Sequence, residues 1–293
     1  MPAMTNARRN AVIGIVVAAV LGSIISTLGG DGGEELGSLP TFAWLVIIAF
    51  VVNIAVFVPS FLAKTEHYYD LTGSLTYLTV TLVALATTTD RDLRTVLLAA
   101  MIVLWAARLG SFLFRRVTRD GGDGRFDKIK LDGLRFSMAW MLQALWVTLT
   151  AGAALAAMTS GAKADLGPVG IIGLVVWLIG FAIEVTADRQ KSAFRADPTN
   201  RGRFIDVGLW AWSRHPNYFG EITLWLGVAI VAAPVLQGWQ YATLVSPVFV
   251  FVLLNFVSGV PMLERRSDRE WGGQEAYEAY KAKTAVLILR PPR

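Results

Sequence analysis

The feature of this chain that most constrains its fold is a series of long apolar runs separated by short clusters of charge. A helix needs about 20 largely apolar residues to cross a bilayer. Such runs lie near residues 11–29, 42–63, 72–88, 96–114, 137–158, 168–186, 219–236 and 242–262. The sequence therefore predicts an all-α, polytopic transmembrane helix bundle of about eight spans.

Composition supports one membrane domain over separate soluble domains. Only 17% of the residues are charged, whereas soluble domains average about 25%. We expect residues 1–293 to form a single integral membrane domain, in which residues 1–35 add an extra first span and an outer loop. The run at 72–88 is short and rich in threonine, so a bundle of seven spans is the alternative.

The basic residues are distributed unevenly between the two sides of this model. All but four of the 27 lysine and arginine residues fall in the two ends and in alternate loops on one side. The exceptions are Arg91, Arg94, Arg108 and Lys163. Because cytoplasmic loops carry an excess of lysine and arginine, both termini are expected to be cytoplasmic.

Several kinds of site are excluded or disfavoured by the sequence. The chain has no cysteine and only two histidines, His67 and His215, so no thiolate chemistry is possible and no metal site is expected. Neither a dinucleotide-binding glycine motif nor a P-loop is present, so any nucleotide must be held by the bundle and not by a Rossmann domain. The basic loops are short and divided, which disfavours nucleic acid binding.

One candidate site lies between the second and third runs. The segment from Lys64 to Asp70 brings Glu66, Tyr68 and Tyr69 together at the inner membrane face. A phenol can donate a proton toward a carbonyl while a neighbouring carboxylate orients it. Tyrosine and charged residues are also common at membrane interfaces, so a purely interfacial role is the alternative.

A second candidate site lies before the seventh run, where the chain reads Ser-Arg-His-Pro-Asn-Tyr-Phe-Gly-Glu from Ser213 to Glu221. Pro216 is suited to the first turn of a helix, whose free N–H groups would then favour an anion near Arg214 and His215. Arginine forks also suit phosphate oxygens. The alternative is that these basic loops only orient the protein in the membrane.

These segments carry a family resemblance. The runs "GLWAWSRHPNYFGEITLWLG", "DRQKSAFR", "PMLERR", "KTEHYYDLTGSLTYL" and "GGDGRFD" resemble the bacterial relatives of the steroid 5α-reductase family, membrane enzymes that reduce an enone C=C bond with NADPH. The resemblance covers about 60–290, the expected reductase-like core. The isoprenylcysteine carboxyl methyltransferases carry a similar "RHP-x-Y", so the motif specifies a superfamily better than one reaction.

The resemblance implies roles for particular residues. For the catalytic site it implies Glu66 as the carboxylate. Trp105 stands where animal enzymes have a tyrosine, so either Tyr69 or Tyr68 takes over as the phenol or a different acid is used. For NADPH it implies contacts from Asp188, Arg195, Arg203 and Asn217, and on a weaker match from Arg125, Arg189, Lys191, Arg214, His215 and Tyr218.

The expected function is therefore NADPH-dependent reduction of a lipid-soluble enone such as a 3-oxo-4-ene steroid. The protein would be an integral membrane protein of a bacterial inner membrane, with its cofactor site cytoplasmic and with membrane lipids and a hydrophobic small molecule as its partners. The alternatives are an S-adenosylmethionine-dependent membrane methyltransferase and a non-enzymatic lipid-binding protein. The oligomeric state is left open.

Overall fold

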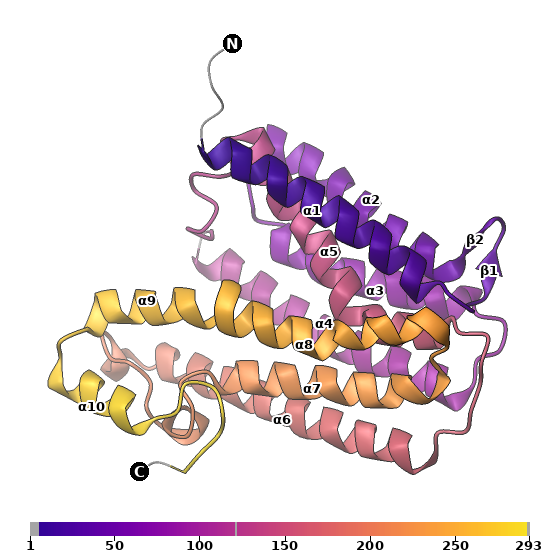
Figure 1. Ribbon diagram of the computed structural model, residues 1–293. Helices are drawn as coiled ribbons and strands as arrows, with labels where there is room; N and C mark the ends of the chain where they lie inside the picture. The colour runs from indigo at the N-terminus through magenta and orange to yellow at the C-terminus, as the bar shows by residue number, and fades with distance from the viewer. Residues whose placement is uncertain (1–5, 121, 292–293) are drawn as a thin grey trace. The chain divides into compact units, whose positions relative to one another are not determined.

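The computed structural model describes residues 6–120 and 122–291, apart from the side chains of residues 119 and 120. Most of these residues are helical (Figure 1). By their internal contacts they divide into two compact units. Unit 1 comprises residues 1–170 and 231–246, and unit 2 comprises residues 171–230 and 247–293.

Unit 1 contains five long helices. They are α1 (Asn6–Gly29), α2 (Thr41–Leu62), α3 (Tyr69–Thr87), α4 (Leu93–Asp120) and α5 (Gly133–Met158). Between α1 and α2, β1 (Glu35–Leu36) pairs antiparallel with β2 (Leu39–Pro40). The 3₁₀ segments η3 (Ala233–Val235) and η4 (Gly238–Val245) complete the unit. Among the described residues this two-stranded ribbon is the only sheet, so that part of the chain holds no Rossmann domain, as predicted.

Helix α5 forms the centre of unit 1, where it packs against α1, α2, α3 and α4. It begins at a well-formed N-cap, because the carboxylate of Asp132 accepts hydrogen bonds from the N–H groups of Leu134 and Arg135. Every residue from 150 to 158 is buried, and most of them are alanine. Such small side chains allow neighbouring helices to approach closely.

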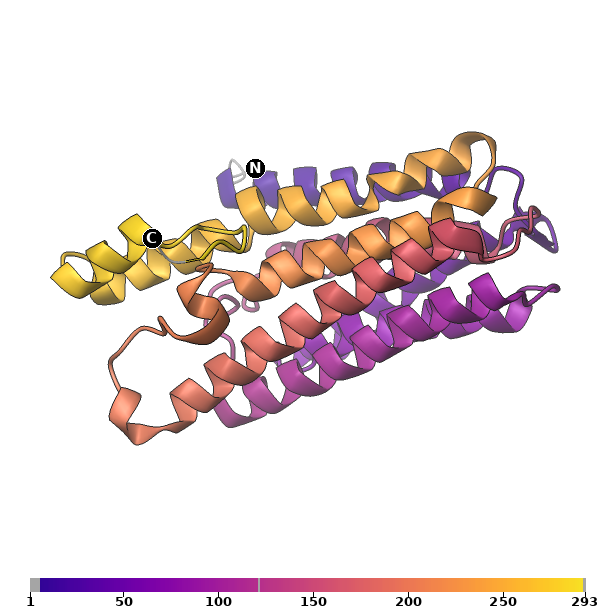
Figure 2. The ribbon, with the colours of Figure 1, turned by 90° about the horizontal axis from the view of Figure 1, so that it is seen from below.

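Unit 2 contains the remaining helices. They are α6 (Gly167–Ala196), α7 (Pro216–Ala232), α8 (Ser246–Val252), α9 (Val260–Trp271) and α10 (Glu275–Lys283), with two short 3₁₀ segments, η1 (Pro198–Asn200) and η2 (Gly208–Ala211), and a π-helical turn, η5 (Leu253–Val257). Helices α6 and α7 lie side by side in two views at right angles (Figures 1 and 2).

Backbone-to-backbone packing joins α6 to α7. A Cβ atom placed on Gly220 would lie 2.6 Å from the backbone nitrogen of Glu184. A Cβ atom on Gly227 would lie 2.5 Å from the backbone nitrogen of Trp177. Real Cβ contacts are longer than this, so only glycine fits at these two positions, as in other closely packed membrane helices.

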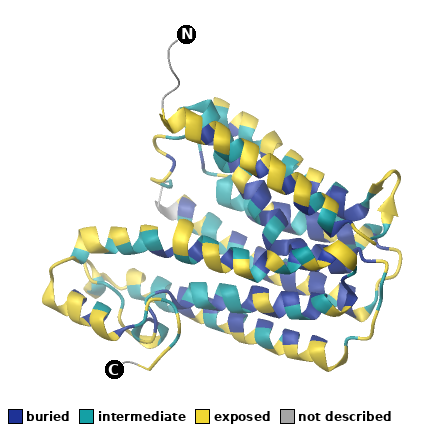
Figure 3. Ribbon diagram, in the orientation of Figure 1, coloured by how far each residue is buried: buried dark blue, intermediate teal, exposed yellow. Residues whose placement is uncertain are grey.

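Seven helical stretches within the described residues are long and apolar enough to cross a membrane. They coincide with seven of the eight predicted runs. Large apolar side chains remain exposed on α1, including Val16 and Ile24, and on α6, including Ile172 and Leu178 (Figure 3). Exposed apolar faces of this extent suit contact with lipid, and the chain is a multi-pass integral membrane protein.

The eighth predicted run, at 72–88, forms helix α3, which is not one of these seven stretches. Several of its hydroxyl groups are buried and hydrogen bonded. Thr76 is fully buried and donates to the carbonyl of Thr72 at 2.7 Å. Asn53 of α2 in turn donates to the hydroxyl of Thr76 at 3.2 Å. Some of the polar side chains that lower the hydropathy of α3 are thus hydrogen bonded inside unit 1.

Candidate active site and cofactor site

Glu66 lies in the turn between α2 and α3 and is only 6% exposed. Its Oε1 accepts the backbone N–H of Asp123 at 2.9 Å, and its Oε2 pairs with Nζ of Lys130 at 2.7 Å. Burial alone would raise the pKa of this carboxyl, but these hydrogen bonds hold its pKa below the ordinary value of 4.5. Glu66 is therefore an ionised carboxylate that ties the α2–α3 turn to the loop before α5.

The two neighbouring tyrosines differ in accessibility. The hydroxyl of Tyr69 donates to the carbonyl of Ala139 at 3.0 Å, and its ring packs against Phe126 and Trp140. The side chain of Tyr68 is 50% exposed. Tyr69 is therefore committed to packing against α5, and Tyr68 offers the more accessible phenol.

Trp105, which the resemblance aligns with a tyrosine of the animal enzymes, contacts a tyrosine of this chain. Trp105 of α4 is buried, and its ring meets that of Tyr77 of α3 edge to face, with 5.1 Å between the centroids. Sequence reasoning assigned Tyr77 no role, because the two residues are far apart in the chain. This contact makes Tyr77 a further candidate for the family's phenol.

Arg125, the cofactor candidate of unit 1, is already held by acidic groups. Its guanidinium pairs with Asp123 at 2.5 Å and lies 3.7 Å from Asp70, which also pairs with Arg116 at 3.2 Å. Half of the Arg125 side chain is exposed. An anionic ligand would therefore have to compete with two carboxylates for this guanidinium.

The other cofactor candidates all lie in unit 2. At the end of α6, Asp188 is buried, whereas Arg189 and Arg195 are exposed. The ammonium group of Lys191 lies 4.4 Å from the ring centroid of Trp210, a favourable cation–π geometry. These residues lie in the last turns of α6, which continues beyond the end near residue 186 that the sequence predicts.

Arg203 is exposed on the loop between η1 and η2. The next residue, Phe204, anchors this loop in a cluster of aromatic rings from α9 and α10. Its ring centroid lies 5.2 Å from that of Tyr277, 5.3 Å from that of Tyr280 and 6.1 Å from that of Trp271. The aromatic cluster thus fixes the segment that carries the arginine.

The Ser213–Asn217 turn is held by the C-terminal segment. Ser213 is fully buried, accepts the N–H of His215 at 3.1 Å and donates to the carbonyl of Leu287 at 2.9 Å. The N–H of Arg214 donates to the carbonyl of Ala285 at 2.8 Å. Pro216 then opens α7, as the sequence predicts.

Glu264 of α9 joins the two basic side chains of this turn. One oxygen lies 2.8 Å from Nε2 of His215 and the other 2.9 Å from Nη2 of Arg214. The ring of Tyr218 stacks on that of His215, with 5.7 Å between the centroids. Of the sequence candidates, the structure thus brings Arg214, His215 and Tyr218 together.

Burial lowers the pKa of His215 below its ordinary value of 6.5, and Glu264 only partly opposes this effect. His215 is therefore neutral at physiological pH. Because a neutral imidazole carries one proton and Nε2 faces the Glu264 carboxylate, we assign the proton to Nε2. Nδ1 is then left as a hydrogen-bond acceptor.

Three polar atoms of this turn are buried and have no protein partner among the described residues. They are Nε of Arg214, Nδ1 of His215 and Oδ1 of Asn217. A buried polar atom without a partner is costly, and the set combines one charged donor with two acceptors. This chemistry fits a nucleotide, whose phosphates accept hydrogen bonds and whose ribose hydroxyls donate them.

A family model described as "Protein of unknown function (DUF1295)" matches residues 56–284. The chain belongs to the DUF1295 family. Helix α1 lies outside the matched region, whereas all the candidate residues named above lie within it.

This DUF1295 member is similar to three named proteins. It is 32% identical to 3-oxo-5-alpha-steroid 4-dehydrogenase 1 of Bos taurus over 84 residues, which are 29% of this chain and 30% of that protein. It is 28% identical to Delta(14)-sterol reductase ERG24 of Saccharomyces cerevisiae over 205 residues, 61% of this chain and 41% of that protein. It is 26% identical to probable O-methyltransferase ustE of Ustilaginoidea virens over 95 residues, 32% of this chain and 33% of that protein.

These likenesses confirm, at low identity, that the DUF1295 member is steroid 5α-reductase-like. The chain spans between 30% and 55% of the length of the curated relatives it matches. No solved structure matches it.

Proposed function

We propose that this protein is an NADPH-dependent membrane reductase that saturates the conjugated C=C bond of a lipid-soluble enone such as a 3-oxo-4-ene steroid. In this reaction a hydride adds to the β-carbon and a proton to the α-carbon. NADPH supplies the hydride when bound. The names of the bovine and yeast relatives support a reductase acting on a steroid or sterol.

The observation that carries the proposal is the buried turn from Arg214 to Asn217. It presents one charged donor and two acceptors that no described protein group satisfies, in the motif that the resemblance assigns to the cofactor. Glu264 orients Arg214 and His215 from behind, so their remaining polar atoms are preorganised for a ligand. Asp188, Arg189, Lys191, Arg195, Arg203 and Tyr218 are the further proposed contacts of the cofactor in unit 2.

In unit 1, we propose that a phenol hydrogen-bonds the ketone and that the ionised carboxylate of Glu66 orients it. A hydrogen bond to the carbonyl oxygen stabilises the enolate that forms when hydride adds to the β-carbon. Tyr68 is the accessible donor, and Tyr69 would first have to release the carbonyl of Ala139. Water or a side chain then protonates the α-carbon.

The distribution of the basic residues supports the proposed orientation, with both termini and the cofactor site cytoplasmic in a bacterial inner membrane. The apolar helix faces support a substrate that arrives from the lipid.

The direct test uses the purified full-length protein in lipid nanodiscs, with NADPH and a 4-ene-3-one steroid. Loss of absorbance at 340 nm and appearance of the saturated ketone by mass spectrometry are expected. Asn217→Ala and Glu66→Gln should reduce turnover, whereas Glu270→Gln, an exposed carboxylate on α9, should not. If NADPH neither binds nor reduces any enone tested, the proposal is wrong.

A second function is favoured by one specific observation, the similarity to a probable O-methyltransferase over 95 residues. In that case the same turn would hold S-adenosylmethionine. A comparison of the thermal shifts produced by NADPH and by S-adenosylmethionine separates the two, since only the true cofactor should stabilise the protein by mass action.

A further inference from the structure

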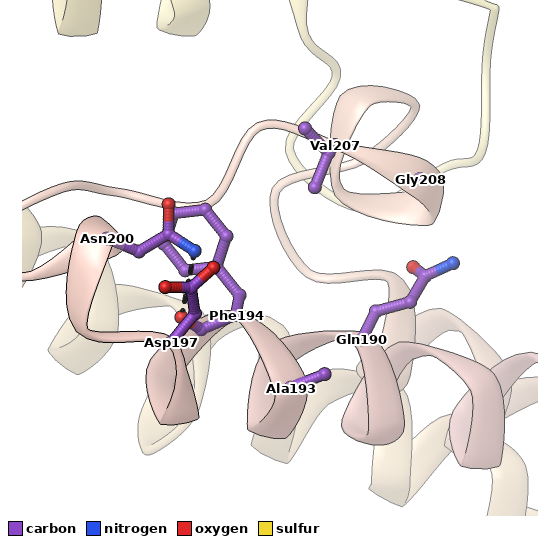
Figure 4. Close-up of a pocket in the computed structure, with 7 residues that line it drawn as sticks. All are labelled: Gln190, Ala193, Phe194, Asp197, Asn200, Val207 and Gly208. Atoms are coloured by element: carbon purple, nitrogen blue, oxygen red, sulfur yellow. Dashed lines mark hydrogen bonds between the residues drawn. The ribbon is translucent and has the colours of Figure 1, made fainter.

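A pocket of about 380 Å³ lies in unit 2 at the end of α6, within the size range of small-molecule sites, about 300–1,000 Å³. Figure 4 shows its walls. Phe194, Asp197 and Asn200 gather on one side, Gln190 and Val207 lie on the other, and the short side chain of Ala193 lies between them. None of these residues belongs to the catalytic or cofactor sets named so far.

The lining of the pocket suits a flat ring. Phe194 supplies an aromatic side chain and Val207 an apolar one, and aromatic side chains favour the stacking of nucleobases. Gly208 also lines the pocket. It has a φ of +60°, and a Cβ atom there would lie 2.5 Å from Nε2 of Gln190, whose Oε1 accepts the N–H of Leu209 at 2.9 Å.

The polar edge of the pocket consists mainly of acceptors. The side-chain amide nitrogen of Asn200 donates to the carbonyl of Phe194 at 3.1 Å, so its Oδ1 remains as an acceptor. Oδ1 of Asp197 accepts both the hydroxyl and the N–H of Thr199, at 2.7 and 2.8 Å. These two hydrogen bonds lower the pKa of Asp197 below 3.8, so its second oxygen is an ionised acceptor at neutral pH.

An edge of acceptors selects a base that carries an exocyclic amino group and rejects one with an oxo group in the same place. Three exposed arginines are close in sequence to the residues that line the pocket, namely Arg195, Arg201 and Arg203. Their guanidinium groups suit the phosphates of the same ligand. The pocket therefore matches an adenine base joined to phosphate.

We propose that this pocket binds the adenine base of the nucleotide cofactor, with Phe194 against the ring and Asp197 accepting from the exocyclic amine. The inference rests on the proposed function only in requiring an adenine nucleotide. Because NADPH and S-adenosylmethionine both carry adenine, it does not depend on which reaction the protein catalyses.

The test compares binding of NADPH with that of its deamino analogue, in which hypoxanthine replaces adenine, to the full-length protein in nanodiscs. Wild type should bind the analogue about tenfold more weakly, since one hydrogen bond is lost and two acceptors face each other. In Asp197→Asn the amide can donate to the oxo group, so the preference should vanish or reverse. Asparagine can still cap η1, so this variant should fold.

Three further variants show whether the effect arises in this pocket. Phe194→Ala should weaken both ligands by about tenfold, and Phe194→Tyr should restore binding. Glu270→Gln makes the same carboxylate-to-amide change on α9 and should alter neither affinity. Equal binding of NADPH and its analogue by wild type, or an unchanged preference in Asp197→Asn, overturns the inference and leaves the proposed reductase standing. If NADPH, S-adenosylmethionine and adenosine 2′,5′-bisphosphate all fail to bind, the inference and the nucleotide-dependent function fail together.

Discussion

The carboxylate of Glu264 lies 2.8 Å from Nε2 of His215, although the two residues are 49 positions apart in the chain. The same carboxylate pairs with Arg214, whose side chain is 13% exposed. Removing one partner of a largely buried ion pair leaves an uncompensated charge. Glu264→Ala should therefore lower the free energy of unfolding by about 2 kcal/mol, less than for a fully buried pair.

This change can be followed by denaturation in detergent. Glu264→Gln should lose less stability, because the amide oxygen still accepts one hydrogen bond. Glu270→Ala on the exposed face of the same helix is the matched control and should leave the stability unchanged. Equal effects of the two alanine variants would mean that the Glu264 contacts contribute nothing.

The buried imidazole of His215 predicts a pH dependence. Its pKa in the folded protein lies below 6.5 because burial disfavours the charged form. At a pH between the pKa of His215 in the folded protein and its ordinary pKa of 6.5 in the unfolded chain, the unfolded chain binds more protons than the folded one. The free energy of unfolding therefore falls as the pH is lowered through this window. Above about pH 6.5 the contribution of His215 is constant.

Thermal denaturation between pH 5 and 8 measures this dependence. In His215→Gln the slope of stability against pH should be flatter than in wild type below pH 6.5. Identical slopes in wild type and His215→Gln would contradict the assignment of a neutral, buried imidazole.

The contact between Glu66 and Lys130 predicts the acid limb of the activity profile. Lys130→Met removes the strongest interaction that holds the pKa of Glu66 down, while burial still raises that pKa. The pH at which activity is lost on the acid side should therefore move upward. Lys128→Met, in the same loop, should not move it.

Glu66→Gln should lower kcat/KM for the enone by about 100-fold, the size typical of removing a group that orients proton transfer. Steady-state kinetics over a range of pH, together with NADPH affinity, distinguish this effect from unfolding. Full activity in Glu66→Gln would exclude a catalytic role for this carboxylate.

The ring of Phe204 predicts a link between the α9–α10 segment and nucleotide binding. Phe204→Ala should cost about 2 kcal/mol of stability, less than for a fully buried ring, and should loosen the loop that carries Arg203. Faster proteolysis within residues 197–208 and weaker NADPH binding are expected. Phe204→Leu should recover most of both properties, and Phe256→Ala, at a 63% exposed ring, should affect neither.

Much of the fold was predictable because a continuous apolar run long enough to span a membrane is a local property of the sequence. The predicted ends were less accurate where helices continue past the apolar region. α6 was predicted to end near 186 and extends to Ala196, and α4 was predicted to end near 114 and extends to Asp120. Charged residues such as Arg189 and Arg195 favour helix as well as water, so hydropathy alone cannot mark the end of such a helix.

The site was predictable only where its residues are close in sequence. The motif from Ser213 to Asn217 identified the turn and the helix start at Pro216. Glu264 and Ala285 contact this turn only because of tertiary packing. No local sequence pattern indicates either contact. The same is true of Tyr77, which reaches Trp105 only because α3 packs on α4.

The glycine contacts between α6 and α7 have a mechanical consequence. Helices whose backbones touch at Gly220 and Gly227 cannot rotate or slide past one another without a steric clash, so the two spans behave as a single stiff rod. A cofactor that binds in unit 2, as proposed, would then have to enter and leave by motion of segments outside these two spans, such as the loop from residue 197 to 215. Cofactor exchange should accordingly be limited by loop motion and not by rearrangement of these spans.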